Sequence, residues 1–256
     1  MSWLGKCAMT GGLALSLCAT ARADDATKIL KAMSDFVGGQ NTIAVTFDSD
    51  IEVITTELQK IQFTSSGQVV LNRPDKMRIR RTGGYADVEL VYDGKTVTLF
   101  GHNTNLYVQE QTSGSIDRVF DELQGRLGTA MPGTDLLVAN SFDTLMTDAV
   151  DAKHIGQGMV DGVECEHLAF RTPEVDWQIW VETGARTIPR KYVITSKTVT
   201  GAPQYTVRIK EWKSEVPGDA SAFAFKAPNE AKKIPVEALR DFDEVPAGVP
   251  FVGGKK

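Results

Sequence analysis

The sequence contains few of the side chains that catalytic and metal sites need. Its 256 residues include only three histidines and three cysteines. It has no Gly-x-Ser-x-Gly nucleophile elbow, no P-loop and no dinucleotide-binding fingerprint. We therefore expect no cofactor and no metal ion, and we do not expect an enzyme.

The charge balance and the shortness of the hydrophobic runs disfavour two further classes. The formal net charge at pH 7 is −5, so nucleic acids and anionic lipid surfaces are poor partners. No apolar run is long enough to form a transmembrane helix, because a span needs about 20 predominantly apolar residues. We expect no nucleic-acid partner and no transmembrane segment in the mature chain.

Residues 1–23 have the pattern of a secretory signal peptide. Lys6 supplies the positive charge, residues 7–19 are mostly apolar or small, and Ala21-Arg22-Ala23 is an A-x-A cleavage site. Leu17 precedes Cys18 where a lipoprotein signal needs a small residue, so we expect cleavage after Ala23 rather than lipidation. The protein is thus predicted to be periplasmic, exported by a cleaved signal peptide. Loss of two positive charges changes the net charge from −5 to −7.

Cleavage leaves Cys165 as the single cysteine, which excludes a disulfide within the chain. Cys165 and His167 are two residues apart on a predicted strand and share one face, with His154 on the neighbouring strand. Their spacing matches no known metal motif, and Cys–His catalysis usually draws its members from separate elements. We interpret them as a buried thiol beside a strand histidine, and an envelope enzyme that uses both is the alternative. His102 lies in a polar turn and is expected to face solvent.

The mature chain has the pattern of antiparallel strands. Alternating apolar and polar side chains over residues 175–212 predict three consecutive strands, and Asp93-Gly94 and Asp161-Gly162 are hairpin signals. About eleven strands are expected, six before a central helical segment and five after it. The predicted fold class is mainly β (α+β), with one domain over residues 24–230 and a flexible tail over residues 231–256.

Two amphipathic helices are predicted, over residues 25–37 and 115–127, with shorter helical pieces over residues 135–146. Gly38-Gly39 ends the first helix. The apolar side chains of the two longer helices are expected to form a lid over the sheet: Ile29, Met33, Phe36, Val119, Phe120 and Leu123.

A short predicted strand carries the basic residues Lys76, Arg78, Arg80 and Arg81. They could contact phosphate or an acidic partner. A solvated strand face is the simpler interpretation, because exposed strand positions are commonly charged.

Three consecutive strands give a large apolar sheet face that another element must cover. Its aromatic residues Trp177, Tyr192 and Tyr205 could line a ligand cavity or belong to an ordinary core. Period-two alternation alone does not distinguish the two, and it leaves open which sheet face is concave.

The segment DWQIWVETGARTIPRKYVITSK (residues 176–197), followed by GAPQYTVRIKEW and FAFKAP, resembles a family of predicted periplasmic proteins of unknown function. That family lies in the lipoprotein-localisation-factor (LolA/LolB-like) superfamily. The order of a first helix, a β-meander, a helical insertion and further strands also resembles this superfamily. The resemblance implies an unclosed antiparallel β-barrel around an apolar cavity, with helices covering the cavity. No motif of the lipoprotein carrier's own functional residues matches this sequence.

The resemblance implies a soluble periplasmic carrier or binding protein for a lipid, a lipoprotein acyl group or another hydrophobic ligand. The alternative is a cell-envelope protein–protein interaction module with no bound lipid, so the expected partner is a hydrophobic small molecule, a lipid or an envelope protein. The implied cavity residues are the apolar members of the face described above: Trp177, Ile179, Val181, Tyr192, Ile194, Tyr205, Val207 and Ile209.

Overall fold

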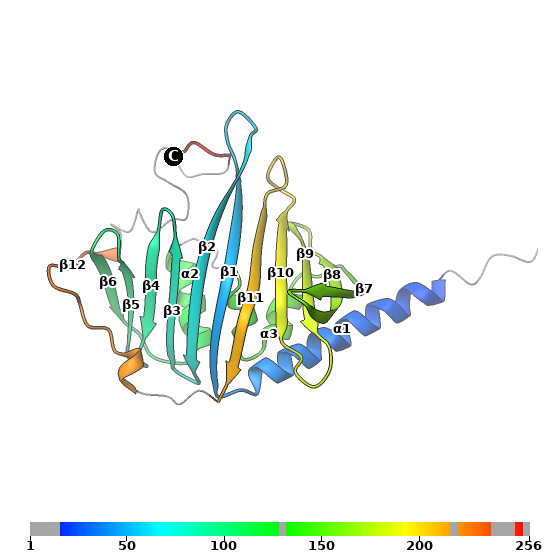
Figure 1. Cartoon of the computed structure of the whole chain (residues 1–256), viewed down its shortest axis with the longest axis horizontal. Coiled ribbons are helices and arrows are strands. Elements are labelled where there is room, and N and C mark those ends of the chain that lie inside the picture. The colour runs from blue at the N-terminus through cyan, green and yellow to red at the C-terminus, as the bar shows by residue number, and fades with distance from the viewer. Residues whose placement is uncertain (1–15, 128–131, 216–219, 237–248, 253–256) are drawn as a thin grey trace, which may run out of the picture.

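A single curled sheet carries the fold (Figure 1). The computed structural model describes residues 16–127, 132–215, 220–236 and 249–252. Within these residues twelve strands follow the order β12-β6-β5-β4-β3-β2-β1-β11-β10-β9-β8-β7. All neighbours pair antiparallel except β12, which pairs parallel with β6. The order ends at β12 and β7, so the sheet is unclosed, and the predicted fold class is confirmed.

The strands form two meanders that meet where β1 pairs with β11. The first comprises β1 (Thr42–Ile54), β2 (Lys60–Asn72), β3 (Lys76–Gly83), β4 (Asp87–Tyr92), β5 (Thr96–Gly101) and β6 (Leu106–Gln111). The second comprises β7 (Asp151–Val160), β8 (Val163–Arg171), β9 (Val175–Glu182), β10 (Pro189–Ser196) and β11 (Gln204–Ser214), and β12 is Lys232–Lys233.

The helices lie together on one side of the sheet, which we call its inner face (Figure 1). They are α1 (Ser16–Gly38), α2 (Ile116–Leu127) and α3 (Ser141–Met146), with the short 3-10 helix η1 (Thr134–Leu136) between α2 and α3. α1 packs on β7, β8 and β9 and contacts α3. A second 3-10 helix, η2 (Ala220–Phe223), follows β11. We call α1, α2, η1 and α3 the lid.

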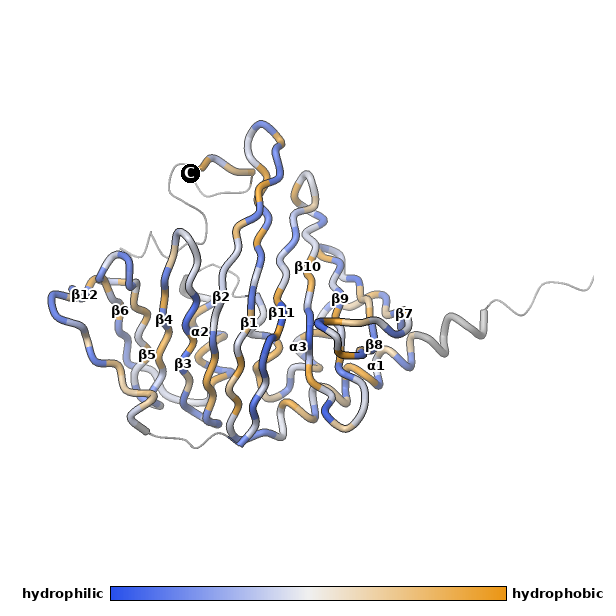
Figure 2. Tube along the Cα trace, in the orientation of Figure 1, coloured by the Kyte–Doolittle hydropathy of each residue, from blue (hydrophilic) through white to orange (hydrophobic). Residues whose placement is uncertain are grey.

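The hairpin signals in the sequence mark real turns. Asp161 and Gly162 have φ angles of 48° and 80°, a pair of left-handed residues that matches the twist of the β7–β8 hairpin. Gly94 lies in the β4–β5 turn with φ of 94°. Along the strands hydrophobic residues recur, whereas the tip of the β1–β2 hairpin is mainly hydrophilic (Figure 2).

The core lies between the inner face and the lid. Strand alternation puts every second side chain on this face, and cross-strand pairs such as Tyr192–Ile179 and Tyr192–Val207 align them from strand to strand. Ile179 and Val181 are fully buried there, as is Met33 of α1. The apolar face predicted from residues 175–212 is therefore the face that the lid covers.

α1 contains the helix predicted over residues 25–37 and is described from Ser16 onward. Residues 16–24 include three alanines, which have the highest helix propensity.

Two parts of the predicted flexible tail are paired with the sheet instead. Lys232 and Lys233 form β12 beside Leu106 and Tyr107 of β6. Phe251 bridges to Thr55 beyond the end of β1. β6 is the last strand of the first meander, and such an edge leaves backbone N–H and C=O groups free. A short extended segment such as β12 can satisfy them without any apolar periodicity in its own sequence.

Candidate functional site

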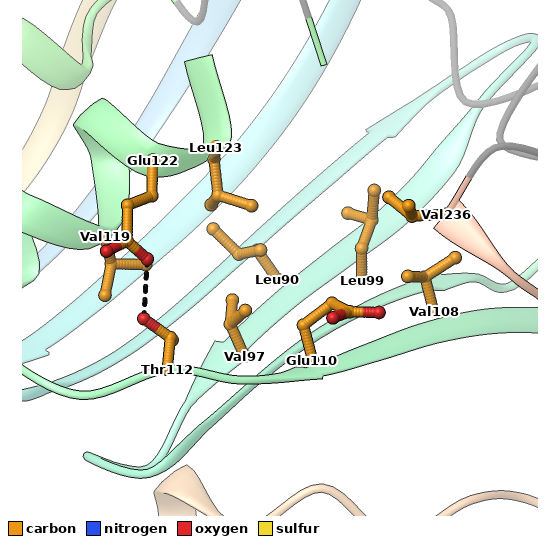
Figure 3. A pocket seen from close by; sticks show the side chains of 10 residues that line it. All are labelled: Leu90, Val97, Leu99, Val108, Glu110, Thr112, Val119, Glu122, Leu123 and Val236. Atoms are coloured by element: carbon orange, nitrogen blue, oxygen red, sulfur yellow. Dashed lines mark hydrogen bonds between the residues drawn. The ribbon is translucent and has the colours of Figure 1, made fainter. Parts of the chain in front are cut away.

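A small pocket lies between α2 and strands β4, β5 and β6 (Figure 3). Its walls are apolar side chains of the sheet and of one face of α2, and its rim carries two glutamates and a threonine. The lining residues are Leu90, Val97, Leu99, Val108, Glu110, Thr112, Val119, Glu122, Leu123 and Val236.

The pocket encloses about 30 Å³. Preformed sites for small molecules usually measure about 300–1,000 Å³, and about 30 Å³ is the share of one water molecule in the liquid. In the closed arrangement seen here the pocket is thus a seam between sheet and lid. A larger guest requires the lid to move.

The attachment of α2 differs between its two ends. At its N-terminal end, the Ile116 N–H donates to the Pro74 carbonyl oxygen at 2.8 Å, and Asp117 accepts from the Ala139 N–H at 3.1 Å. Val119 and Phe120 are buried, whereas Leu123 at the pocket is only half-buried. Leu123 is therefore less tightly packed against the sheet than Val119 and Phe120.

A polar link crosses the pocket rim. Glu122 of α2 accepts from the Thr112 hydroxyl at 2.7 Å (Figure 3). Glu122 also accepts from the Arg118 guanidinium at 2.9 Å, within α2 itself. Both bonds are at least partly exposed to water, so they contribute little net stability. The Thr112 bond joins α2 to the chain after β6 without locking it.

The predicted cavity and lid residues do lie together. All eight residues of the expected cavity and all six of the expected lid belong to one apolar cluster. Trp177 stacks on Phe170 with ring centroids 4.0 Å apart and meets the edge of Tyr192 at 5.9 Å. Side chains of the lid fill the space over this half of the sheet, so a guest could reach Trp177 only after the lid had moved.

A buried acid joins the lid to the sheet. Tyr192 of β10 donates its hydroxyl to Asp135 of η1 at 3.0 Å, and the Asp135 carboxylate is buried even though the residue as a whole is not. Burial raises the pKa of Asp135 to about 6, and the hydrogen bond from Tyr192 opposes part of this rise. Burial and the Asp135 charge also raise the pKa of Tyr192.

The lid itself depends on a close approach between α1 and α3. The hydroxyl of Ser34 accepts from the Phe142 N–H at 2.9 Å, and a Cβ added at Gly38 would overlap the backbone carbonyl of Ala139. Only glycine allows the end of α1 to approach the start of α3 this closely.

We expect Gly38→Ala to lower the free energy of unfolding by about 1–3 kcal/mol, the usual cost of overpacking. Urea unfolding followed by tryptophan fluorescence measures it. Gly125→Ala is the matched control, because a Cβ there meets nothing within 4 Å and alanine favours the α2 helix by up to about 1 kcal/mol. Equal stability of Gly38→Ala and the parent chain would contradict the close packing.

Cys165 and His167 do not form a reactive pair. The Cys165 thiol is fully buried and donates to the Val163 carbonyl oxygen at 3.5 Å, and burial raises its pKa to about 11. His167 stacks on Trp180 with centroids 4.1 Å apart and shares a hydrogen bond of 2.9 Å with Gln178. The other strand histidine, His154, bonds Glu166 at 2.6 Å. The interpretation of a structural thiol beside a strand histidine fits these contacts.

Most of the basic strand β3 is engaged with neighbouring elements. Arg80 donates to both carboxylate oxygens of Asp87, and this guanidinium holds the pKa of Asp87 below its ordinary value. Arg78 contacts Glu89 at 3.3 Å and donates to the Ala224 carbonyl oxygen. These arginines stabilise the sheet surface and do not gather into a phosphate cradle.

The described ranges hold neither a metal-binding cluster nor a membrane-spanning helix. No three His, Cys, Asp or Glu side chains among these residues are placed to hold a metal ion. No helix in the described part of the chain has the length and apolarity needed to cross a membrane.

The geometry defines a class of protein: an unclosed, curled antiparallel sheet with helices across its inner face (Figure 1). The chain belongs to the family described as "Predicted periplasmic protein (DUF2092)", whose model matches residues 26–237. The family resemblance stated from residues 176–197 is thereby confirmed. None of the curated proteins compared matches the chain.

Several solved structures are similar to the chain at low sequence identity. An uncharacterized conserved protein from Thermus thermophilus is 13% identical with a TM-score of 0.48, covering 82% of this chain and 98% of that chain. LprF from Mycobacterium bovis is 10% identical with a TM-score of 0.45, covering 82% and 99%. A LolA superfamily protein from Nitrosomonas europaea is 12% identical with a TM-score of 0.33, covering 78% and 97%.

Proposed function

We propose that this protein is a periplasmic carrier or binding protein for a lipid, a lipoprotein acyl group or another hydrophobic ligand. The observation that supports the proposal is the apolar seam beneath α2, at the end of the sheet where the strands do not close. The ligand enters there, and the lid moves away as the ligand is buried.

The second half of α2 is the moving part. Leu123 is half-buried, and full burial of such a side chain is worth about 1.5–3 kcal/mol, so lifting it away from the sheet costs less than that. A buried methylene gains about 0.8 kcal/mol, so an acyl chain of roughly sixteen carbons gains on the order of 12 kcal/mol before entropy costs. Burial of the guest therefore outweighs the exposure of Leu123.

A long ligand continues from the seam along the inner face. Once the lid has moved, it meets the apolar strand residues that the sequence indicated as cavity-lining. We assign these residues to the deeper part of the site: Trp177, Ile179, Val181, Tyr192, Ile194, Tyr205, Val207 and Ile209. The corresponding lid side chains are Ile29, Met33, Phe36, Val119, Phe120 and Leu123.

We also propose that the protein is exported to the periplasm. Residues 1–23 act as a signal peptide that is cleaved after Ala23, and the mature chain works in the periplasm. The mass of the N-terminal peptide of protein recovered from the periplasm tests this. A peptide that starts at Asp24 is expected, and a retained Met1 would contradict it.

Native mass spectrometry tests the binding proposal. Protein purified from the periplasm without detergent is expected to carry extra mass that organic extraction releases as a lipid. After extraction, the uncharged apolar probe N-phenylnaphthylamine is expected to bind with a rise in fluorescence. A chain that shows the mass of the polypeptide alone and does not bind the probe would contradict the proposal.

A second candidate function is docking of an envelope protein at the free edge of β7. This strand ends the sheet, and three large apolar side chains on or beside it are more than half exposed: Val150, Ile155 and Met159. An exposed sheet edge with apolar side chains can accept a strand of a partner. Loss of a co-purifying protein in Ile155→Lys, with no lipid in the parent chain, would favour this function.

A further inference from the structure

We propose that residues 232–236 cover one end of the pocket at rest, where Val236 forms part of its wall, and that an incoming ligand displaces them. This inference rests on the proposed function and specifies how the same site is regulated. Residues 232–236 are called the plug below.

The plug reaches the pocket from a distant part of the sequence. Val236 lines the pocket together with residues of β4, β5, β6 and α2, and Figure 3 shows it beside Leu99 and Val108 at one end of the pocket. An aliphatic side chain in an apolar pocket has the chemistry expected of the guest. The Val236 side chain thus makes the apolar contacts that part of a ligand would make.

Backbone hydrogen bonds join the plug to the edge of the sheet. The Lys232 N–H donates to the Asn105 carbonyl oxygen at 3.0 Å, and the Ile234 N–H donates to the Tyr107 carbonyl oxygen at 2.9 Å. Lys232 and Lys233 are exposed, and β12 is only two residues long. Backbone hydrogen bonds at an exposed edge contribute little net stability, because water replaces them when they break.

The chain just before the plug is anchored more firmly. Phe223 is 1% exposed, and Phe225 packs against the rings of Phe100 and Tyr107 at 5.6 and 5.3 Å. A displaced plug therefore stays close to β6 and competes with the ligand at a high effective concentration. Such a competitor keeps the apolar walls covered when no ligand is present and makes release of a ligand easier.

The test compares three single variants in the full mature chain. Ile234→Pro removes the N–H that bonds Tyr107, and the residue before Pro235 is already restricted to the extended conformation. Val236→Ser removes apolar contact inside the pocket. Val252→Pro is the matched control, because it removes an equivalent bond from the Val252 N–H to the Ile54 carbonyl oxygen, 2.7 Å long, away from the pocket lining.

We expect Ile234→Pro and Val236→Ser to bind N-phenylnaphthylamine about three- to tenfold more tightly than the parent chain, as the loss of one weak hydrogen bond or apolar contact predicts. Val252→Pro should bind like the parent. In the parent chain, the Ile234 amide should exchange with deuterium faster when the probe is added. A synthetic peptide of residues 230–236 should compete with the probe in Ile234→Pro, and a scrambled peptide should not.

Each other outcome overturns the inference in a distinct way. Equal binding by all four chains would leave the proposed function in place and remove the plug. Weaker binding by Val236→Ser and Ile234→Pro would make residues 232–236 a fixed wall of the site. Tighter binding by Val252→Pro as well would show a general loosening of the chain. No binding by any chain, before or after lipid extraction, would overturn the proposed function itself.

Discussion

Replacement of Leu99 by tryptophan is expected to weaken binding of N-phenylnaphthylamine at least tenfold, which corresponds to about 1.4 kcal/mol. Leu99 projects from β5 into the pocket and is half-buried (Figure 3). The indole ring would occupy the space where a guest must begin to enter. Because the pocket is partly empty and its rim is exposed, the unfolding free energy should change by less than about 1.5 kcal/mol.

Titration of the lipid-extracted protein by fluorescence measures the affinity, and urea unfolding shows that the variant is folded. Lys95→Trp is the matched control, because it adds the same ring in the exposed β4–β5 turn. An unchanged affinity in Leu99→Trp, with both variants folded, would place the binding site elsewhere.

The second large effect is a loss of stability of about 3 kcal/mol as pH rises from about 4 to about 7, caused by Asp135. Its pKa is raised from 3.8 to about 6 in the folded chain, and one pKa unit corresponds to about 1.4 kcal/mol. Between these pH values the folded chain holds a proton that the unfolded chain has released. The stabilisation is thus complete below about pH 4 and lost above about pH 6.

Asp135→Asn keeps an acceptor for the Tyr192 hydroxyl and removes the buried charge. The difference in unfolding free energy, variant minus parent, should therefore rise by about 3 kcal/mol between pH 4 and pH 7.5. The comparison with the parent cancels the contributions of other acids, such as Asp87 and Asp176, whose pKa values are lowered by ion pairs. A constant difference for Asp135→Asn would show that the carboxylate is well solvated.

Because Asp135 belongs to the lid and Tyr192 to the inner face, this pair also affects how readily the lid opens. Ionisation of Asp135 above pH 6 favours an arrangement in which water reaches the carboxylate. Ligand entry should then be faster at pH 7.5 than at pH 5 in the parent chain and independent of pH in Asp135→Asn.

Much of the fold was predictable because it follows from local patterns. Alternation in residues 175–212 predicted three strands and their buried face, and Asp161-Gly162 predicted a turn that the φ angles confirm. The stripes over residues 25–37 and 115–127 predicted the helices that cover this face. These features depend on neighbouring residues alone, and a sequence displays them directly.

The pocket was not predictable in the same way. Its strand residues Leu90, Val97 and Leu99 alternate within the hairpin around Asp93-Gly94, so their strands were predicted. Nothing in that pattern shows that a gap remains between α2 and the sheet here. Val236 was missed because it belongs to a segment that pairs through backbone groups. Two-residue pairing leaves no periodic signal in side chains.

In the closed state, side chains of the lid fill the space that was expected to be a cavity. Ile179 and Val181 are buried, as a cavity wall covered by a lid would be. An ordinary packed core would bury them equally well. Sequence patterns predict which side chains are buried. They do not predict whether a buried side chain is covered by other side chains of the protein or by a ligand. Only the positions of the lid side chains show that this half of the inner face is filled.

Photo-crosslinking with a diazirine-bearing fatty acid tests most directly whether the inner face receives an apolar guest beneath α2. Labelled peptides are expected from β5, β6 and the second half of α2, with Leu99, Val108 and Leu123 as the modified residues. Labels confined to the exposed apolar residues Leu58, Val150, Ile155 and Met159 would contradict binding on the inner face.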